Sequence, residues 1–494
     1  MRTLMIGLAL FATSLAFTLN AIGQTNKRVN KRPNFIIILA DDLGYGETGC
    51  YGQKFIRTPN IDKLASEGMR FTDFYAGSTV CAPSRCCLMT GMNTGHAQIR
   101  DNMEIGNWDD YMGQAPLEPD TYTIARMLKQ AGYKTACIGK WGLGGPGSAG
   151  VPNEQGFDFF FGYLCQRQAH NHYPAYLWYN KEKFLTGNPD IPSQQKLIGN
   201  PKDPANYKKY RGTSYAEELF TDEALHFIKS NTDSAFFLLM AYTLPHLALQ
   251  VPESYLQEYR DLMNDSPYTG QMGYLPVFYP HATYAAMIGA LDYATGKILQ
   301  ALAESHLDSN TCVIFTSDNG ATFSLGGADP QFFNSNGPFR GGKGSLYEGG
   351  IRVPCIARWP GKIMARQVCS VPYASWDIMP TLAQLAQLGL PKDIDGISFA
   401  PALHGAKNPP LHEFLYWEYT STGGNQAIRA GKWKVVRKDL IKEPMRRYEL
   451  YDLSEDPGEK INVAEQHPEI IQKMKVYSRK HTPASKPVWN FLHN

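Results

Sequence analysis

Residues Cys81 to Gly91, which read CAPSRCCLMTG, place three cysteines beside a proline and an arginine. A thiol in such a stretch is a metal ligand, half of a disulfide, a nucleophile, or a small buried apolar group. The chain has nine cysteines, and this odd count leaves at least one thiol outside any disulfide. Cys86 and Cys87 are adjacent and pair poorly with each other, and no paired C-x-x-C spacing indicates zinc. Most of the cysteines are therefore predicted to be buried thiols.

Four side chains with oxygen donors follow two apolar runs of the chain. Asp41 and Asp42 end PNFIIILADD, and Asp318 and Asn319 end NTCVIFTSDN. Two adjacent ionised carboxylates repel each other, so a site that holds both needs a cation. Oxygen donors suit calcium or magnesium and fit zinc poorly, and we expect calcium. The alternative for Asp41 and Asp42 is a helix cap or a turn at the end of a strand.

Lys140, His246 and Lys343 have the residue types of an anion-binding site. The first two again follow apolar runs, in TACIGK and FFLLMAYTLPH. Lys343 lies in GPFRGGKGSLYEGGIRVP, whose glycines allow the backbone to approach a ligand closely. A metal ion and two lysines would suit a tetrahedral oxyanion ester, whose transition state spreads negative charge over its oxygens. The alternative for each lysine is a solvated surface residue.

The elements that must position these side chains are four strand-like runs, which alternate with helical patterns. The runs cover residues 33–44, 133–144, 235–246 and 310–320, and the helical patterns cover 58–71, 121–133, 214–231 and 284–305. This alternation predicts an α/β fold with a mainly parallel central sheet and helices on both faces. Ligands of such sheets bind outside the carboxyl ends of the strands, so we expect the polar groups to converge there. The alternative is that strand ends are simply where chains become polar.

Composition and the two ends of the chain set further limits. With 494 residues the chain can bury a large core, and a net charge of +2 argues against a nucleic-acid partner. Residues 1–23, with one arginine and an apolar run, predict a signal peptide, and no later stretch has the ~20 apolar residues of a membrane span. We therefore expect export to the periplasm or secretion. From residue 404 the pattern indicates antiparallel strands and a final helix, which predicts a catalytic domain at 30–403 and a small antiparallel-sheet subdomain at 404–494.

The stretch CAPSR followed by CCLMTG resembles the C-x-P-S-R-x-x-x-L/M-T-G signature of the formylglycine-dependent sulfatases, which are arylsulfatase-like members of the alkaline-phosphatase-like superfamily. The likeness continues through ADDLGYGETGCYG, GKWGLG, TLPH, SDNG, RGGKGSLYEGGIRVP and LYDLSEDPGEKINVA, and so covers nearly all of the chain after the predicted signal peptide. The resemblance implies an alkaline-phosphatase-like fold and hydrolysis of a sulfate ester.

The resemblance also implies that Cys81 is oxidised to formylglycine, an aldehyde that hydrates to a geminal diol. The partner for this step would be a formylglycine-generating enzyme or an anaerobic sulfatase-maturating enzyme. One diol oxygen would attack sulfur, and the second would then expel sulfate as the aldehyde re-forms. The competing interpretations of Cys81 are a structural thiol and a direct thiolate nucleophile.

Residue roles follow from the matched motifs. Asp41, Asp42, Asp318, Asn319 and the modified Cys81 match the family's calcium ligands. The resemblance further implies that Arg85 holds the formylglycine, that Lys140 and Lys343 bind sulfate oxygens, and that His246 protonates the leaving alcohol.

One position departs from the family pattern. Many members read G-K-W-H-L-G, whereas this chain has GKWGLG, with Gly142 in place of a histidine that assists the diol. Either His96, His170 or His172 enters the site instead, or Arg85 and metal-bound water suffice.

The substrate is predicted from residues near these motifs. Sugars are bound by polar side chains and aromatic rings. The candidates of these types are Arg100, Asp101 and Asn102 in GHAQIRDN, and Arg167, His170 and His172 in GYLCQRQAHNHYPAYLWYN. Similar stretches occur in bacterial exo-acting carbohydrate sulfatases, so we expect a terminal sulfated sugar, of galactose or N-acetylgalactosamine type. Ordinary loop packing is the alternative for each residue. Two other functions stay open: a phosphate mono- or diester hydrolase of the same superfamily, and a catalytically degenerate carbohydrate-binding homologue.

Overall fold

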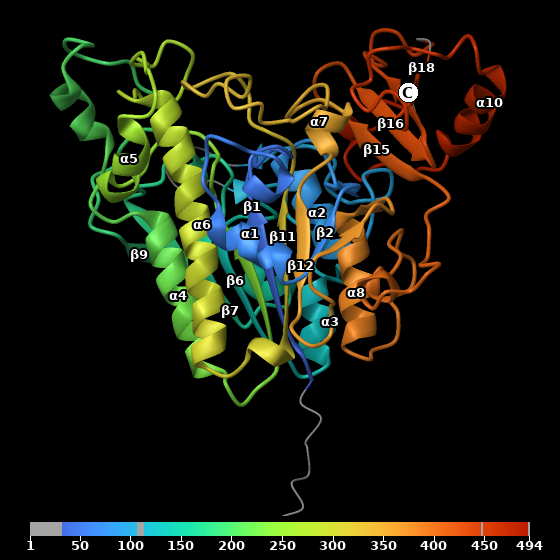
Figure 1. Cartoon of the computed structure of the whole chain (residues 1–494), viewed down its shortest axis with the longest axis horizontal. Coiled ribbons are helices and arrows are strands. Elements are labelled where there is room, and N and C mark those ends of the chain that lie inside the picture. The colour runs from blue at the N-terminus through green and yellow to red at the C-terminus, as the bar shows by residue number, and fades with distance from the viewer. Residues whose placement is uncertain (1–31, 106–112, 446–447, 493–494) are drawn as a thin grey trace, which may run out of the picture. The chain divides into compact units, whose positions relative to one another are not determined.

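A ten-stranded sheet forms the centre of the described structure, a computed structural model that covers residues 32–105, 113–445 and 448–492 (Figure 1). The predicted signal peptide lies outside the described residues. The strand order is β13-β2-β12-β11-β1-β10-β6-β7-β8-β9. In chain order these strands are β1 (Asn34–Ala40), β2 (Met69–Phe71), β6 (Lys134–Lys140), β7 (Phe159–Tyr163), β8 (Tyr176–Tyr179), β9 (Glu182–Leu185), β10 (Phe236–Ala241), β11 (Thr311–Ser317), β12 (Cys355–Arg358) and β13 (Gln367–Cys369).

The middle of the sheet is parallel. Strands β11, β1, β10, β6 and β7 all run in the same direction, while β12, β8 and β9 pair antiparallel to their neighbours. Every residue of β1 is buried, which explains why its sequence is a continuous apolar run: helices cover both of its faces. The predicted α/β fold with a mainly parallel sheet is confirmed.

The two faces of the sheet have separate cores. Phe35, Ile37 and Leu39 of β1 pack with α2 (Cys81–Thr90), α3 (Ile124–Gln130) and α8 (Ile378–Leu385). Ile36 and Ile38 point the other way and pack with α1 (Pro59–Ser66), α4 (Ala216–Ser230) and α6 (Pro280–Glu304), because side chains of a strand alternate between its faces. The remaining helices of the main part are α5 (Glu253–Arg260), α7 (Glu348–Ile351) and α9 (Ala400–Leu403). Among the described helices, none combines the length and apolar character of a membrane span.

A second, antiparallel sheet lies near the C-terminus, as predicted (Figure 1). Its strands are β15 (Leu415–Tyr419), β16 (Asn425–Ala430), β17 (Trp433–Arg437) and β18 (Glu449–Asp452), and α10 (Pro468–Tyr477) follows. Trp417 and Val436 on one face join the core of α2 and α8, whereas Ile428 on the other face packs with Met474 of α10. The domain boundary at residues 403/404 stays a prediction. Two short pairs, β3 (Phe74–Tyr75) with β14 (Tyr373–Ala374) and β4 (Glu104–Ile105) with β5 (Gly113–Gln114), complete the strands.

Buried charges join this second sheet to the main part. Lys434 of β17 lies 2.8 Å from Glu348, the first residue of α7, and 3.0 Å from Glu459. Burial raises the pKa of Glu348, but the attraction of Lys434 and two arginines outweighs it and lowers that pKa to about 2. The ion pair fixes the start of α7, and therefore also the preceding loop, which carries Lys343.

Candidate active site

The ends of four neighbouring strands bring the predicted site residues together. Asp41 and Asp42 follow β1, and Asp318 and Asn319 follow β11, its neighbour in the sheet. Lys140 is the last residue of β6, and His246 lies five residues beyond the end of β10. The backbone N–H of Asp42 donates to Asp318 Oδ1 across 3.1 Å, which ties the first two strand ends together. The convergence expected from the sequence is confirmed.

Cys81 begins α2 at the centre of this group. Its Sγ lies 3.4 Å from Asp41 Oδ1, 3.5 Å from Lys140 Nζ and 3.5 Å from Lys343 Nζ. Burial and the charge of Asp41 raise the pKa of the Cys81 thiol to about 12. An unmodified Cys81 is therefore a poor thiolate nucleophile at neutral pH.

Arg85 lies one helical turn after Cys81 and faces the same site. Its Nε and Nη2 donate to Asp318 Oδ2 across 3.0 and 2.8 Å, and its Nη1 donates to the carbonyl oxygen of Lys140 across 2.5 Å. The guanidinium, which is almost fully buried, thus links α2 to the ends of β11 and β6. This fork fixes the start of α2, and therefore Cys81, against the strand ends.

The two lysines pair with the two carboxylates that follow β1. Lys140 Nζ lies 2.5 Å from Asp41 Oδ2, and Lys343 Nζ lies 2.7 and 2.9 Å from the oxygens of Asp42. Burial raises the pKa of Asp41, but the positive charges of Lys140, Arg85 and Lys343 help to lower it well below its usual value. Asp41 is therefore ionised, and both lysines lie in the interior of the protein, contrary to the surface alternative.

The oxygen donors fit a hard cation. Asn319 Nδ2 donates to Asp42 Oδ1 across 2.8 Å, while Asn319 Oδ1 is buried and has no hydrogen-bond partner in the described part of the chain. A buried amide oxygen without a partner is costly unless it binds something else. Side-chain ligand atoms of Asp41, Asp42, Cys81 and His246 also lie within 4.8 Å of one another. Carboxylates and an amide oxygen are the donors that calcium prefers.

His246 lies beside Asp42, with Nε2 3.6 Å from Asp42 Oδ2. Its Nδ1 is 2.6 Å from the carbonyl oxygen of Leu247 and therefore carries a proton, which leaves Nε2 directed at the site. Burial, followed by the charges of Lys343 and Lys140, lowers the pKa of His246 well below its usual value. The imidazole is therefore neutral in the free protein.

Three of the predicted sugar-binding residues, Arg100, Asp101 and Asn102, make hydrogen bonds to other parts of the protein. Arg100 is 2% exposed and donates to Glu418 across 2.6 Å. Asp101 accepts hydrogen bonds from the backbone N–H and the hydroxyl of Ser421. Asn102 accepts from the backbone N–H of Ala82, next to Cys81. These side chains brace the start of α2 and the small sheet, and the structure does not bring Arg100 to the strand ends.

The other predicted sugar-binding residues, which follow β7, differ in their distance from the site. His170 stacks on His246 with ring centroids 4.7 Å apart, so it lies at the site. His172 is fully buried behind His246, and Arg167 pairs with Glu104 across 3.0 Å. His96, another predicted substitute for the family histidine, pairs with Asp395 across 2.8 Å. Of the three candidate histidines, His170 stacks on the ring of His246, whereas His172 contacts only its backbone carbonyl oxygen.

Gly142 leaves space that another side chain fills. A Cβ at this position would lie 1.8 Å from Gln166 Nε2, and the backbone of Gly142 has a φ of +78°. Gln166 is 4% exposed, and neither its Nε2 nor its Oε1 has a partner within the residues that the structure describes. Gly142 lies two residues after Lys140. The amide of Gln166 therefore occupies the position that a side chain at residue 142 would take.

Sequence reasoning missed three aromatic residues around the site. The ring of Tyr274 lies 5.4 Å from that of His170 and 6.5 Å from that of His246. Phe323 is 39% exposed, and Lys343 Nζ lies 5.7 Å from its ring. Burial and the charge of Asp101 raise the pKa of Tyr419 in β15, whereas the positive charge of Lys343 lowers it. Phe323 was detectable as an apolar residue five positions after Asp318, but Tyr274 and Tyr419 lie in segments with no motif.

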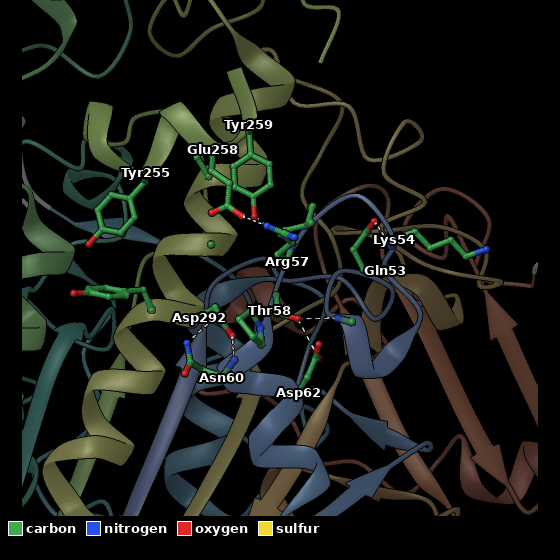
Figure 2. A pocket seen from close by; sticks show the side chains of 16 residues that line it. Gln53, Lys54, Arg57, Thr58, Asn60, Asp62, Tyr255, Glu258, Tyr259 and Asp292 are labelled. Carbon is green, nitrogen blue, oxygen red and sulfur yellow. Dashed lines mark hydrogen bonds and ion pairs between the residues drawn. The ribbon is translucent and has the colours of Figure 1, made fainter. Parts of the chain in front are cut away.

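A cavity of about 610 Å³ beside the start of α1 is large enough for a ligand, but several of its polar groups pair with one another (Figure 2). Asp292 accepts hydrogen bonds from the backbone N–H groups of Asn60 and Ile61, and Arg57 pairs with Glu258 across 3.3 Å. None of the residues predicted for catalysis lines it. The strand ends are therefore the better candidate site.

Comparisons with known proteins agree with this assignment. Residues 33–388 match the family model described as Sulfatase, and residues 341–481 match the model described as N-sulphoglucosamine sulphohydrolase, C-terminal. The chain is 34% identical to arylsulfatase A of Homo sapiens, over 90% of this chain and 87% of that protein. It is 31% identical to an N-acetylgalactosamine-6-O-sulfatase of Bacteroides thetaiotaomicron, over 92% and 94% of the two chains. A crystal structure of Ps i-CgsB in complex with k-i-k-neocarrahexaose superposes with a TM-score of 0.74 at 28% identity, and covers 92% of this chain and 94% of that one.

Proposed function

Because the chain belongs to the sulfatase family and is a sulfuric ester hydrolase, we propose that it releases sulfate from a terminal sulfated sugar of galactose or N-acetylgalactosamine type. The fold is alkaline-phosphatase-like. One observation carries the proposal: Cys81 Sγ lies within 3.5 Å of both Lys140 and Lys343, and 3.4 Å from Asp41. A nucleophile at residue 81 is thus surrounded by the positive charge that a sulfate group requires.

Residue 81 fits the family's formylglycine. Hydrated formylglycine supplies one hydroxyl that attacks sulfur and a second that, on losing a proton, expels sulfate. Asp41, Asp42, Asp318 and Asn319 would hold calcium next to this residue, and Asn319 Oδ1, which has no partner among the described residues, supports that role. Arg85, fixed by Asp318, holds residue 81 in place.

Lys140 and Lys343 bind the sulfate oxygens, since both ammonium groups already lie 3.5 Å from Cys81 Sγ. His246 donates a proton to the oxygen of the leaving alcohol. Its pKa is lowered in the free protein, and the negative charge of the bound ester raises that pKa, so that Nε2 gains a proton when substrate is present. The proton donor is thereby charged only in the substrate complex.

Two observations support a sugar as the leaving group. His170, Tyr274 and Phe323 place rings beside the catalytic histidine and Lys343, and aromatic rings stack well on sugar faces. A relative that is 31% identical bears the name N-acetylgalactosamine-6-O-sulfatase, and the structure that is 28% identical holds a neocarrahexaose. We further propose that the protein is exported, is matured at Cys81 by a formylglycine-forming enzyme, and acts in glycan degradation.

The test uses protein co-expressed with a maturation enzyme, with conversion of Cys81 verified by peptide mass. Release of sulfate and of phosphate is measured on a panel of sulfated mono- and oligosaccharides, aryl sulfates and phosphate esters, beside the Cys81→Ala variant. We expect sulfate release from terminal sulfated galactose or N-acetylgalactosamine, and none from the variant. Faster phosphate release would favour the phosphate-ester alternative, and binding without turnover by matured protein would favour the degenerate homologue.

A further inference from the structure

We propose that Glu217 and His172 act as a positioning pair for His246, which neither the sequence motifs nor the family comparisons assign. His172 Nε2 lies 2.9 Å from the backbone carbonyl oxygen of His246, and His172 Nδ1 lies 3.2 Å from Glu217 Oε1. His172 is fully buried, and Glu217, in α4, is 3% exposed. The pair therefore connects α4 to the turn that carries His246.

The hydrogen bonds fix the orientation of the His172 ring. A carbonyl oxygen only accepts, so His172 Nε2 carries a proton. The hydroxyl of Thr243 donates to Glu217 Oε1 and also lies 3.1 Å from His172 Nδ1, so its own proton is already used. Nδ1 faces the carboxylate of Glu217 and the hydroxyl of Thr243, which together fix the plane of the ring. The ring of His172 is therefore held at both nitrogens, by the carboxylate of Glu217 on one side and the backbone carbonyl of His246 on the other.

Residues 170–172 also hold the turn that carries His246 through backbone hydrogen bonds. The backbone N–H of Ala248 donates to the carbonyl oxygen of His170 across 3.3 Å, and the backbone N–H of His172 donates to Gln250 Oε1 across 2.9 Å. The ring of His170 stacks on that of His246. Residues 170–172 therefore contact the turn of residues 243–250 through both backbone and side chains, which leaves His246 little freedom to rotate.

This inference rests on the proposed role of His246 as proton donor. A proton donor must lie within hydrogen-bond reach of the leaving oxygen, so a small displacement of His246 slows turnover without changing how sulfate binds. Loss of the pair should therefore lower kcat on a sugar sulfate while KM changes little. Loss of the pair should lower kcat less on an aryl sulfate, because the phenolate leaves without a proton.

The experiment combines His172→Ala and Glu217→Gln with His246→Ala, singly and together, in matured protein. We expect each single substitution at residues 172 and 217 to lower kcat on the sugar sulfate by about 10- to 100-fold, since positioned proton transfer contributes about 100- to 10,000-fold. In the His246→Ala background the same substitutions should cause no further loss, because their effect acts through His246. The Glu217→Gln variant keeps the size of the side chain and serves if His172→Ala fails to fold. His96→Ala, which removes a histidine paired with Asp395 away from this turn, is the matched control and should leave kcat unchanged.

Equal losses in the wild-type and His246→Ala backgrounds would overturn the inference, as they would show a general structural effect. Unchanged kcat in the single variants would overturn it as well. A failure of the proposed function looks different: His246→Ala itself would then slow sugar and aryl sulfates equally, or matured protein would release no sulfate.

Discussion

Replacement of Gly142 by alanine tests the claim that Gln166 occupies its side-chain space. The φ of +78° at Gly142 costs a residue with a Cβ about 1–2 kcal/mol. The added Cβ would lie 1.8 Å from Gln166 Nε2, and overpacking of a buried site typically costs about 1–3 kcal/mol more. Gly142→Ala should therefore lower the free energy of unfolding by about 2–5 kcal/mol in total.

A double-mutant cycle separates the two contributions. In a Gln166→Ala background the clash is absent, so Gly142→Ala should cost only the backbone part of about 1–2 kcal/mol. The assay is urea-induced unfolding of the four proteins, followed by tryptophan fluorescence. Gly147→Ala is a matched control, because Gly147 has a φ of +73° and nothing within 4 Å of its Cβ position. It should cost the backbone part alone in both backgrounds. Equal costs of Gly142→Ala in the two backgrounds would refute the packing argument.

Three further predictions concern buried charges. Arg100→Ala leaves the carboxylate of Glu418 buried without its arginine, so it should lower the free energy of unfolding by about 3–5 kcal/mol in thermal or urea unfolding. The KM of the folded enzyme should stay unchanged. A raised KM with unchanged stability would instead indicate substrate contact. Removal of metal with a chelator should lower the melting temperature, and calcium should restore it, with one ion per chain by elemental analysis. Asn319→Ala should weaken calcium retention. Restoration by zinc but not by calcium would contradict the oxygen-donor assignment. Lys434→Met removes the cation that pairs with Glu348 and should cost about 3–5 kcal/mol and expose the small sheet to proteolysis; an unchanged digestion pattern would argue against this link.

The sequence predicted the strands of the sheet better than the segments between them. The run of residues 34–40 is apolar throughout because both faces of β1 are covered, and this pattern has few alternatives in a long α/β chain. The helical pattern predicted for residues 58–71 was too long: α1 ends at Ser66, and residues 69–71 form β2. The apolar residues Met69 and Phe71 fit either periodicity, and pairing with β12 and β13 decides for the strand.

The site shows the same contrast. Groups at strand ends, such as Asp41 and Lys140, were predictable because parallel strands deliver their ends to one edge. Arg100 has the right type for a sugar site, but its ion pair with Glu418 depends on a strand more than 300 residues later, which no local pattern reports. Gln166 was missed for a related reason, since its role follows from the space above Gly142 and not from its own neighbours in sequence.

The central claim is that a modified Cys81 is the nucleophile of sulfate release, and the most direct test relates activity to modification. Protein samples are prepared with different fractions of Cys81 converted to formylglycine, each fraction is measured by peptide mass spectrometry, and sulfate release from a terminal sulfated sugar is measured on the same samples. We predict that activity rises linearly with the converted fraction and passes through zero at no conversion. Sulfate release that persists at full rate in unconverted protein would contradict the proposal.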